Sequence, residues 1–129
     1  GREGLPGAAG VAAVLGHVFP PWVRCRGGKG VATAAGMLAP LAPIAVLLAL
    51  ASFGLVFAMS RRVSAGSLAG ALSFPAWAAL LGADGPVLTA GVATAAILLW
   101  SHRENVARLV AGSEPRLRRS LPGDAEDAE

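Results

Sequence analysis

A glycine-rich stretch around Lys29 combines residue types that bind phosphate. Gly27, Gly28 and Gly30 flank this lysine, and because glycine lacks a Cβ, backbone amides there can approach an anion closely. The apolar residues that follow predict a helix, whose N-terminal amides and dipole favour a bound phosphate. The stretch departs from the P-loop motif, which requires a glycine where Val23 stands and a serine or threonine in place of Gly30. A flexible basic loop that only sets the orientation in a membrane is the alternative.

A second motif joins Arg61 to Ser64 and Ser67. Residues three apart lie on the same face of a helix, so both serine hydroxyls can face one ligand. Alternatively, one serine caps the N-terminus of the helix and the arginine is only a basic anchor. The sequence leaves both interpretations open.

A third motif begins with His102 and Asn105, again three residues apart, directly after an apolar run. If the helix continues, both side chains can face one pocket. Glu104 and Arg108 are four residues apart and can pair along the same helix. An amphipathic helix at the membrane surface is the alternative. One histidine, one asparagine and no paired carboxylate are too few ligands for a metal site.

Two further residues carry a weaker signal. His17 is interpreted as a residue that packs helices together. Cys25 is the only cysteine in the chain. A single cysteine excludes a disulfide framework. Cys25 is interpreted as an ordinary loop residue, since the sequence places no general base beside it.

The elements that must position these residues are membrane helices. Of the 129 residues, 54% are hydrophobic and 15% are charged, against roughly 25% charged in an average soluble domain. This balance excludes an intrinsically disordered chain and argues against a soluble globule. Apolar runs cover residues 5–19, 31–60, 67–81 and 86–100, and several such runs in so short a chain indicate lipid. The expected fold is an all-α, polytopic membrane bundle with short or re-entrant helices.

Basic residues, apart from Arg2, fall in three short clusters at residues 24–29, 61–62 and 102–119. With a net charge of +3, this clustering suits membrane loops or small anionic ligands better than nucleic acid. The positive-inside rule puts all three clusters in the cytoplasm, and a turn at residues 82–86 connects the last two runs on the outside.

The long run at residues 31–60 must then be broken to keep its two flanking clusters on one side. Pro40 and Pro43 can divide it into a short re-entrant helix before residue 39 and a return helix from Leu41. A single plain span, which would leave Arg61 and Arg62 outside, is the competing topology.

Taken together, the three motifs resemble those of the PlsY family, the bacterial acyl-phosphate-dependent glycerol-3-phosphate acyltransferases. The family's Gly-His-x-Phe-Pro and Gly-Gly-Lys-Gly-Val-Ala-Thr stretches resemble residues 16–20 and 27–33. Its Arg-x-x-Ser-x-x-Ser block resembles residues 61–67, and its His-Arg-Glu-Asn-x-x-Arg-Leu-x-x-Gly-x-Glu block resembles residues 102–114. The family's N-terminal Ser-Gly-Asn-x-Gly-Ala-Thr-Asn block has no counterpart here. We therefore expect an N-terminally truncated fragment.

The resemblance implies a multi-pass enzyme of the bacterial inner membrane, with active-site loops in the cytoplasm and without a cofactor or nucleic-acid partner. Such an enzyme transfers a fatty acyl group from acyl-phosphate to the 1-hydroxyl of glycerol 3-phosphate. The products are lysophosphatidic acid and phosphate, and the reaction begins bacterial phospholipid synthesis. The membrane domain is expected at residues 1–119, followed by an acidic, disordered tail at residues 120–129. The alternative is a transporter or channel subunit for a phosphorylated solute, which predicts charges within spans or an internal repeat.

The resemblance also assigns roles to individual residues. Catalytic roles fall on Lys29, His102 and Asn105. Phosphate-binding roles fall on Gly27, Gly28, Gly30, Thr33, Arg61, Ser64 and Ser67. Supporting roles fall on His17, Glu104, Arg108 and Glu114. His102 is the candidate general base, and an oxygen of a substrate phosphate is the alternative proton acceptor.

Overall fold

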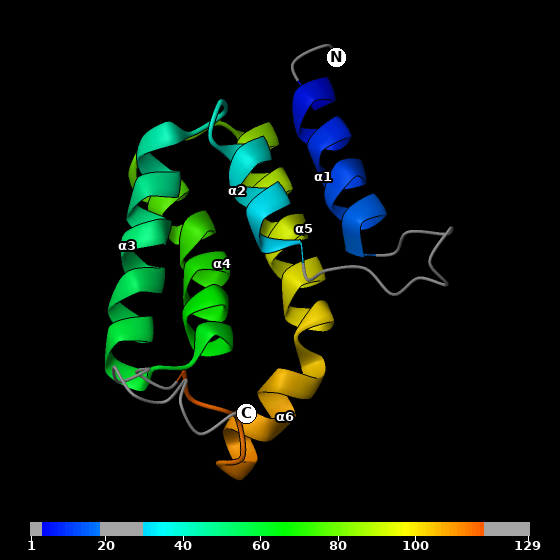
Figure 1. Ribbon diagram of the computed structural model, residues 1–129. Coiled ribbons are helices and arrows are strands. Elements are labelled where there is room, and N and C mark those ends of the chain that lie inside the picture. The colour runs from blue at the N-terminus through cyan, green and yellow to red at the C-terminus, as the bar shows by residue number, and fades with distance from the viewer. Residues whose placement is uncertain (1–3, 19–29, 118–129) are drawn as a thin grey trace, which may run out of the picture.

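The computed structural model describes residues 4–18 and 30–117 (Figure 1). Within these ranges the chain forms six α-helices and no strand, which confirms the predicted all-α fold. The helices are α1 (Leu5–Val18), α2 (Val31–Leu38), α3 (Pro43–Ser60), α4 (Val63–Leu80), α5 (Gly85–Ser101) and α6 (Arg103–Ala111). The expected acidic tail lies outside the described residues.

Two of these helices, α3 and α4, are each 18 residues long and apolar enough to cross a membrane. The pair α5 and α6 passes the same test as one span, with a bend of 63° between the two helices. Large apolar side chains are exposed along α3, among them Ile44, Leu47 and Leu55. So much exposed apolar surface is costly in water and favourable in lipid. The expected polytopic bundle is therefore present.

The long apolar run is broken as expected. The helix α2 ends at Leu38, a turn follows, and α3 begins with Pro43 at its first position, where proline costs no hydrogen bond. The two helices run in opposite directions (Figure 1), so a single continuous helix is excluded. At 1.5 Å per residue, α2 is about 12 Å long and α3 about 27 Å. As a result, α2 begins about halfway along the bundle, where its first turn can reach a site between the helices.

Gly30 precedes α2 in a conformation that favours glycine, with φ of 80°. A Cβ at this position would also lie 2.9 Å from Cγ2 of Val18 in α1. The last glycine of the predicted phosphate-binding stretch therefore has a structural reason to be glycine, independent of any ligand.

The helices α3 and α4 form a tight antiparallel hairpin joined only by Arg61 and Arg62. Gly66 and Gly70 of α4 allow this close approach. A Cβ at position 66 would lie 2.9 Å from the carbonyl oxygen of Phe53, and a Cβ at position 70 would lie 3.1 Å from the carbonyl oxygen of Ala49. Small residues at helix contacts are the usual means by which membrane helices pack. The hairpin therefore holds the start of α4 firmly against the end of α3.

The core lies between the helices in two clusters. Leu38, Ala45, Val46, Ala49, Phe74 and Ala78 form one cluster, and Val14, Val18, Ala34 and Leu98 form the other. The first cluster joins α2, α3 and α4, and the second joins α1, α2 and α5. Together they fix the short helix α2 within the bundle, so that its first turn faces the beginning of α4 and the end of α5.

Candidate active site

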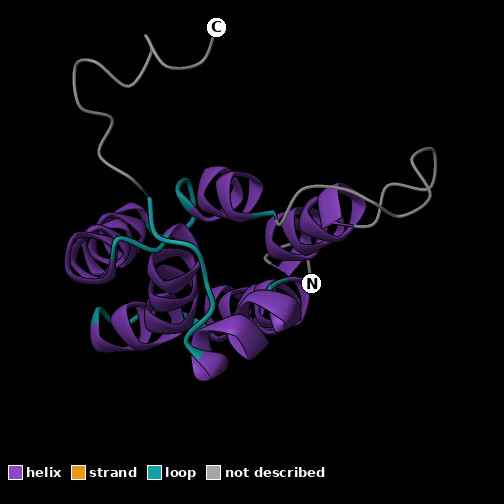
Figure 2. Cartoon of the chain, turned by 60° about the horizontal axis from the view of Figure 1, so that its bottom comes forward, coloured by secondary structure: helices purple, strands orange, loops and turns teal. Residues whose placement is uncertain are grey.

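A cavity of about 700 Å³ lies at the end of the bundle where the Arg61–Arg62 connection and α6 meet. Figure 2 views the molecule from this end, and the segment after α6 passes across it. The lining comes from α2, α3, α4 and α6, from the junction of α5 and α6, and from that segment: Val31, Ala32, Ala35, Leu50, Phe53, Val63, Ser64, Ser67, His102, Asn105, Arg108, Glu114, Pro115, Arg116 and Leu117. The second and third sequence motifs therefore converge on one cavity.

Ser64 and Ser67 reach this cavity because both lie within α4, which begins at Val63. The interpretation that they share a helix face is confirmed, whereas the capping alternative is wrong: Arg62 is the N-cap residue, and no side chain caps this helix. Both serines are 6% exposed. The Ser67 hydroxyl makes no hydrogen bond within the part of the chain that the structure describes, so it remains available to a ligand in the cavity.

Glu114 organises the polar wall of the cavity. One carboxylate oxygen accepts hydrogen bonds from Asn105 Nδ2 at 2.7 Å and from Ser64 Oγ at 2.8 Å. The other accepts one from Arg108 Nε at 2.7 Å. The side chain is buried, with the residue 8% exposed. Glu114 thus ties the third motif to the second, across fifty positions of sequence.

These contacts also determine the charge of Glu114. The hydrogen bond from Asn105 is the largest cause that lowers the pKa of this carboxyl from 4.5 to about 2; burial opposes the shift, and Arg108 and Ser64 add to it. Glu114 is therefore a fixed anion at neutral pH, with its oxygens already used as acceptors. It is suited to holding Asn105 and Ser64 in place and unsuited to accepting a proton during a reaction.

The predicted pairing of Glu104 with Arg108 is not formed. The helix α6 ends at Ala111, and its C-cap Gly112, with φ of 75°, reverses the chain. The amides of Ser113 and Glu114 then donate to the Arg108 carbonyl. This turn brings Glu114 back beside Arg108, which pairs with it instead. Glu104 is exposed and forms no ion pair with the residues that the structure describes.

His102 lies at the junction of α5 and α6 and is 2% exposed. Its Nδ1 is 2.8 Å from the carbonyl oxygen of Leu98. A carbonyl only accepts hydrogen bonds, so Nδ1 carries the hydrogen and, in the neutral ring, Nε2 carries the lone pair. His102 and Asn105 were expected to share a pocket only if the helix continued. They line the same cavity even though the helix bends between α5 and α6.

Arg61 uses its guanidinium within the protein. Its Nε and Nη2 donate to the carbonyl oxygen of Leu117 at 3.1 and 3.0 Å, and the Leu117 amide donates to the Arg61 carbonyl at 2.7 Å. Arg61 therefore holds the segment after α6 against the α3–α4 connection.

The remaining predicted residues are not brought to the cavity by the described structure. Gly27, Gly28 and Lys29 lie outside the described residues, as does the side chain of His17. Thr33 is half-buried on α2 and is not among the residues that line the cavity. Gly30, which follows Lys29 in the sequence, directly precedes Val31, which does line the cavity.

Several lining residues are not among the candidates that the sequence suggests. Pro115 and Leu117 carry no catalytic signature, and Phe53 is one apolar residue among many in its run. Arg116 belongs to the third basic cluster, for which the sequence suggests membrane loops or small anionic ligands without distinguishing this residue. The reversal at Gly112 places Pro115, Arg116 and Leu117 at the cavity, whereas Phe53 reaches it from α3.

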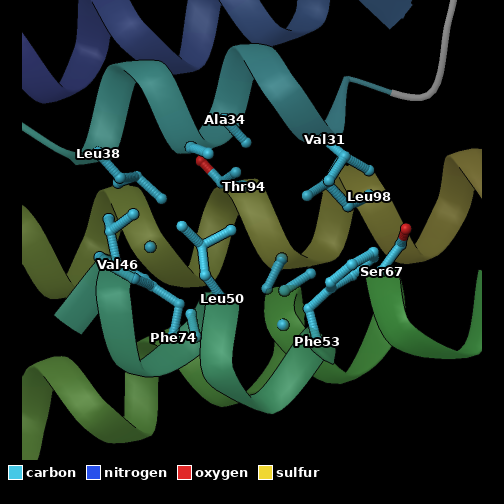
Figure 3. A pocket seen from close by; sticks show the side chains of 16 residues that line it. Val31, Ala34, Leu38, Val46, Leu50, Phe53, Ser67, Phe74, Thr94 and Leu98 are labelled. Carbon is cyan, nitrogen blue, oxygen red and sulfur yellow. The ribbon is translucent and has the colours of Figure 1, made fainter. Parts of the chain in front are cut away.

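A second, smaller cavity of about 60 Å³ lies deeper between α2, α3, α4 and α5 (Figure 3). Its lining is almost wholly apolar and includes Phe74 and Leu98. Five residues border both cavities: Val31, Ala35, Leu50, Phe53 and Ser67. A cavity with polar side chains on one part of its wall, at the end of the bundle, therefore adjoins an almost wholly apolar one within it. This arrangement suits a substrate with a charged head and a hydrocarbon tail.

A sequence profile described as glycerol-3-phosphate acyltransferase matches residues 3–112. The chain belongs to this family. The predicted family is thereby confirmed. Among curated relatives with the same description, the chain is 42% identical over 118 residues to a protein of Hyphomonas neptunium, covering 90% of this chain and 56% of that one. It is 46% identical over 112 residues to a protein of a Ruegeria species, and this match covers 84% of this chain and 54% of that protein.

Solved structures agree with the sequence comparison. The crystal structure of PlsY, an integral membrane glycerol 3-phosphate acyltransferase, in its glycerol 3-phosphate form matches with a TM-score of 0.79 and 34% identity. The match covers 83% of this chain and 54% of that one, and the lysophosphatidic acid form gives the same TM-score. This likeness confirms the integral membrane fold. The chain spans about half the length of the relatives that it matches.

Proposed function

We propose that the whole protein that carries this chain transfers a fatty acyl group from acyl-phosphate to the 1-hydroxyl of glycerol 3-phosphate. The observation that carries the proposal is the meeting of Ser67, His102 and Asn105 in one cavity that adjoins an almost wholly apolar one. Membership of the glycerol-3-phosphate acyltransferase family favours this reaction over transport of a phosphorylated solute.

In the proposed reaction, the 1-hydroxyl oxygen attacks the acyl carbonyl carbon. The bond from that carbon to the phosphate oxygen breaks, and inorganic phosphate leaves. The hydroxyl proton passes either to Nε2 of His102, which carries the lone pair, or to a phosphate oxygen of a substrate. Because acyl-phosphate is already activated, positioning and electrostatics can supply most of the acceleration.

Asn105 and the serines position glycerol 3-phosphate in this scheme. The Asn105 amide nitrogen is held by Glu114, which fixes the orientation of the amide, so that its oxygen can accept a hydrogen bond from a hydroxyl. Ser67 can donate its hydroxyl to a phosphate oxygen. Glu114 holds Asn105 and Ser64 by hydrogen bonds and is itself paired with Arg108, and neither Glu114 nor Arg108 reacts in this scheme.

The glycine-rich stretch supplies the charge that the phosphates need. Gly27, Gly28 and Gly30 offer backbone amides, and Lys29 neutralises the leaving phosphate. This part of the proposal is supported by the position of Gly30, which directly precedes the cavity-lining Val31, and by the residue types in the stretch.

The proposed location is the bacterial inner membrane, with the cavity facing the cytoplasm. Arg61, Arg62 and the segment around Arg116 lie at one end of the bundle. The connection that contains Asp84 lies at the other end, between α4 and α5. The positive-inside rule favours the cytoplasm for the arginine-rich end.

The donor is the sharpest part of this proposal to test. The sequence has no dinucleotide-binding glycine fingerprint that would signal a nucleotide-containing donor. The whole protein, purified in detergent, is incubated with radiolabelled glycerol 3-phosphate and either palmitoyl-phosphate or palmitoyl-CoA. We expect lysophosphatidic acid and an equal amount of inorganic phosphate from palmitoyl-phosphate alone. Efficient product formation from palmitoyl-CoA would refute the donor, and no product from either would refute the reaction.

A further inference from the structure

The segment after α6 is anchored at both ends across the mouth of the larger cavity. We call residues 113–117 the strap. At its start, the amides of Ser113 and Glu114 donate to the Arg108 carbonyl at 2.8 and 3.2 Å. At its end, three hydrogen bonds join Leu117 to Arg61, two from the guanidinium and one to the Arg61 carbonyl. The backbone of the strap is therefore fixed on both sides of its middle residues.

Arg116 lies between these anchors and lines the cavity. Arg108, which also lines it, is paired with Glu114, and Arg61 is bound to Leu117. Arg116 makes no hydrogen bond or ion pair with any residue in the described ranges. Among the described residues that line the cavity, Arg116 thus supplies the positive charge that is not already balanced by a carboxylate.

Arg61 adopts a backbone conformation that L-residues rarely take. Its φ of 56° is the only positive value among the described non-glycine residues, and such a conformation is retained only when surrounding contacts determine it. Arg61 caps the end of α3 in this conformation, and its amide donates to the Phe57 carbonyl at 2.7 Å. The three hydrogen bonds to Leu117, directly after Arg116, add to this contact. The bonds to Leu117 therefore connect the end of α3 to the backbone next to Arg116.

We propose that Arg116 binds the phosphate group of a substrate and that Arg61 is a positioning residue that holds Arg116 at the cavity. This inference rests on the proposed function, which places two phosphate-bearing substrates at this site. A guanidinium presents donors in a fixed fork that matches two oxygens of a phosphate. The Ser67 hydroxyl, which lines the same cavity, can supply a further donor.

The first test separates Arg116 from a merely structural role. In the whole protein, Arg116→Gln raises the KM of one phosphate substrate about 10- to 100-fold while kcat stays within about threefold, as expected for the loss of a charged hydrogen bond. Separate titrations of glycerol 3-phosphate and acyl-phosphate show which substrate is bound. Arg116→Lys, which keeps the charge, recovers part of the lost substrate affinity.

The matched control is Arg103→Gln, because Arg103 lies over the Trp100 ring at 3.9 Å and does not line the cavity. Unchanged KM values for both substrates in Arg116→Gln would overturn the proposal.

The second test concerns Arg61. Arg61→Asn removes the guanidinium while retaining a residue that tolerates positive φ, so that loss of folding and loss of function can be separated. If Arg61 acts through Arg116, the double variant Arg61→Asn with Arg116→Gln raises the KM of the phosphate substrate no further than the single variants do. Additive losses would show that Arg61 contacts the phosphate itself and would overturn its positioning role.

A binding measurement distinguishes failure of this inference from failure of the proposed function. Calorimetric titration with inorganic phosphate requires no acyl transfer. We expect Arg116→Gln to weaken phosphate binding about 10- to 100-fold relative to the natural protein. Equal phosphate affinities would refute the role of Arg116 even in an active enzyme. Weakened phosphate binding in a protein that transfers no acyl group would refute the proposed reaction alone.

Discussion

Glu114→Gln should cost both stability and activity, and the size of the effect follows from its contacts. Hydrogen bonds to a charged acceptor are worth about 1.5–3 kcal/mol, against about 0.5–1.5 kcal/mol for neutral ones. Glutamine keeps one acceptor oxygen for Asn105 and Ser64, so those two bonds weaken by about 1–1.5 kcal/mol each. The Arg108 side chain is 43% exposed, so its lost pairing adds only about 0–1 kcal/mol. The total is about 2–4 kcal/mol.

If this loss is expressed fully in the transition state, kcat/KM falls about 30- to 1,000-fold, since each factor of ten corresponds to 1.36 kcal/mol. The assay is phosphate release from acyl-phosphate at varied glycerol 3-phosphate, with a thermal unfolding curve in detergent for each variant. Glu104→Gln is the matched control, because Glu104 is exposed and makes no ion pair with the described residues. Activity of Glu114→Gln within about threefold of the natural protein, or an equal loss in Glu104→Gln, would refute the reasoning.

Three further outcomes follow from the account. Lys29→Ala should lower kcat about 10²- to 10³-fold in the phosphate-release assay, and near-normal turnover would argue against the phosphate cradle. Gly66→Ala should lower the melting temperature, because its Cβ would lie 2.9 Å from the Phe53 carbonyl oxygen, whereas Gly54→Ala, with nothing within 4 Å of its Cβ, should not. The stability gap between the natural protein and Glu114→Gln should be constant at neutral pH and narrow as pH falls from 4.5 toward about 2, where the carboxyl takes up its proton. A gap that persists at the lowest pH would contradict the charge assigned to Glu114.

Much of the helical framework could be predicted from local patterns in the sequence. The apolar runs located the helices, and the proline pair marked the break before α3. The run predicted at residues 67–81 begins at Val63 in the structure. The extra turn is less apolar, and tertiary packing of Gly66 on Phe53 stabilises it.

The polar centre of the site depends on contacts that no local pattern contains. The spacing of Ser64 and Ser67 was enough to place them on one face, because helix geometry alone decides it. The partner of Arg108 was not predictable in the same way. Glu104 has the favourable spacing, but the reversal at Gly112 brings Glu114 into a buried position with three donors. Burial and multiple hydrogen bonds outweigh one exposed pair along a helix.

The position of Arg116 in the strap could not be predicted from the local sequence either. A run of arginines after a membrane helix ordinarily indicates orientation, and nothing in the local sequence distinguishes Arg116 from its neighbours. Its position depends on Arg61, which lies more than fifty positions earlier. Only the folded hairpin brings the two segments together.

Protection of a single cysteine by glycerol 3-phosphate tests most directly whether the larger cavity is the substrate site. In a Cys25→Ser background, Val63→Cys places a thiol on the cavity wall, and Ala107→Cys places one on an exposed part of α6 outside it. At a concentration about ten times its dissociation constant, glycerol 3-phosphate should slow alkylation of the thiol at position 63 about tenfold. It should leave the thiol at position 107 unaffected, and glycerol should protect neither. Equal alkylation rates at position 63 with and without glycerol 3-phosphate would contradict the assignment of this cavity.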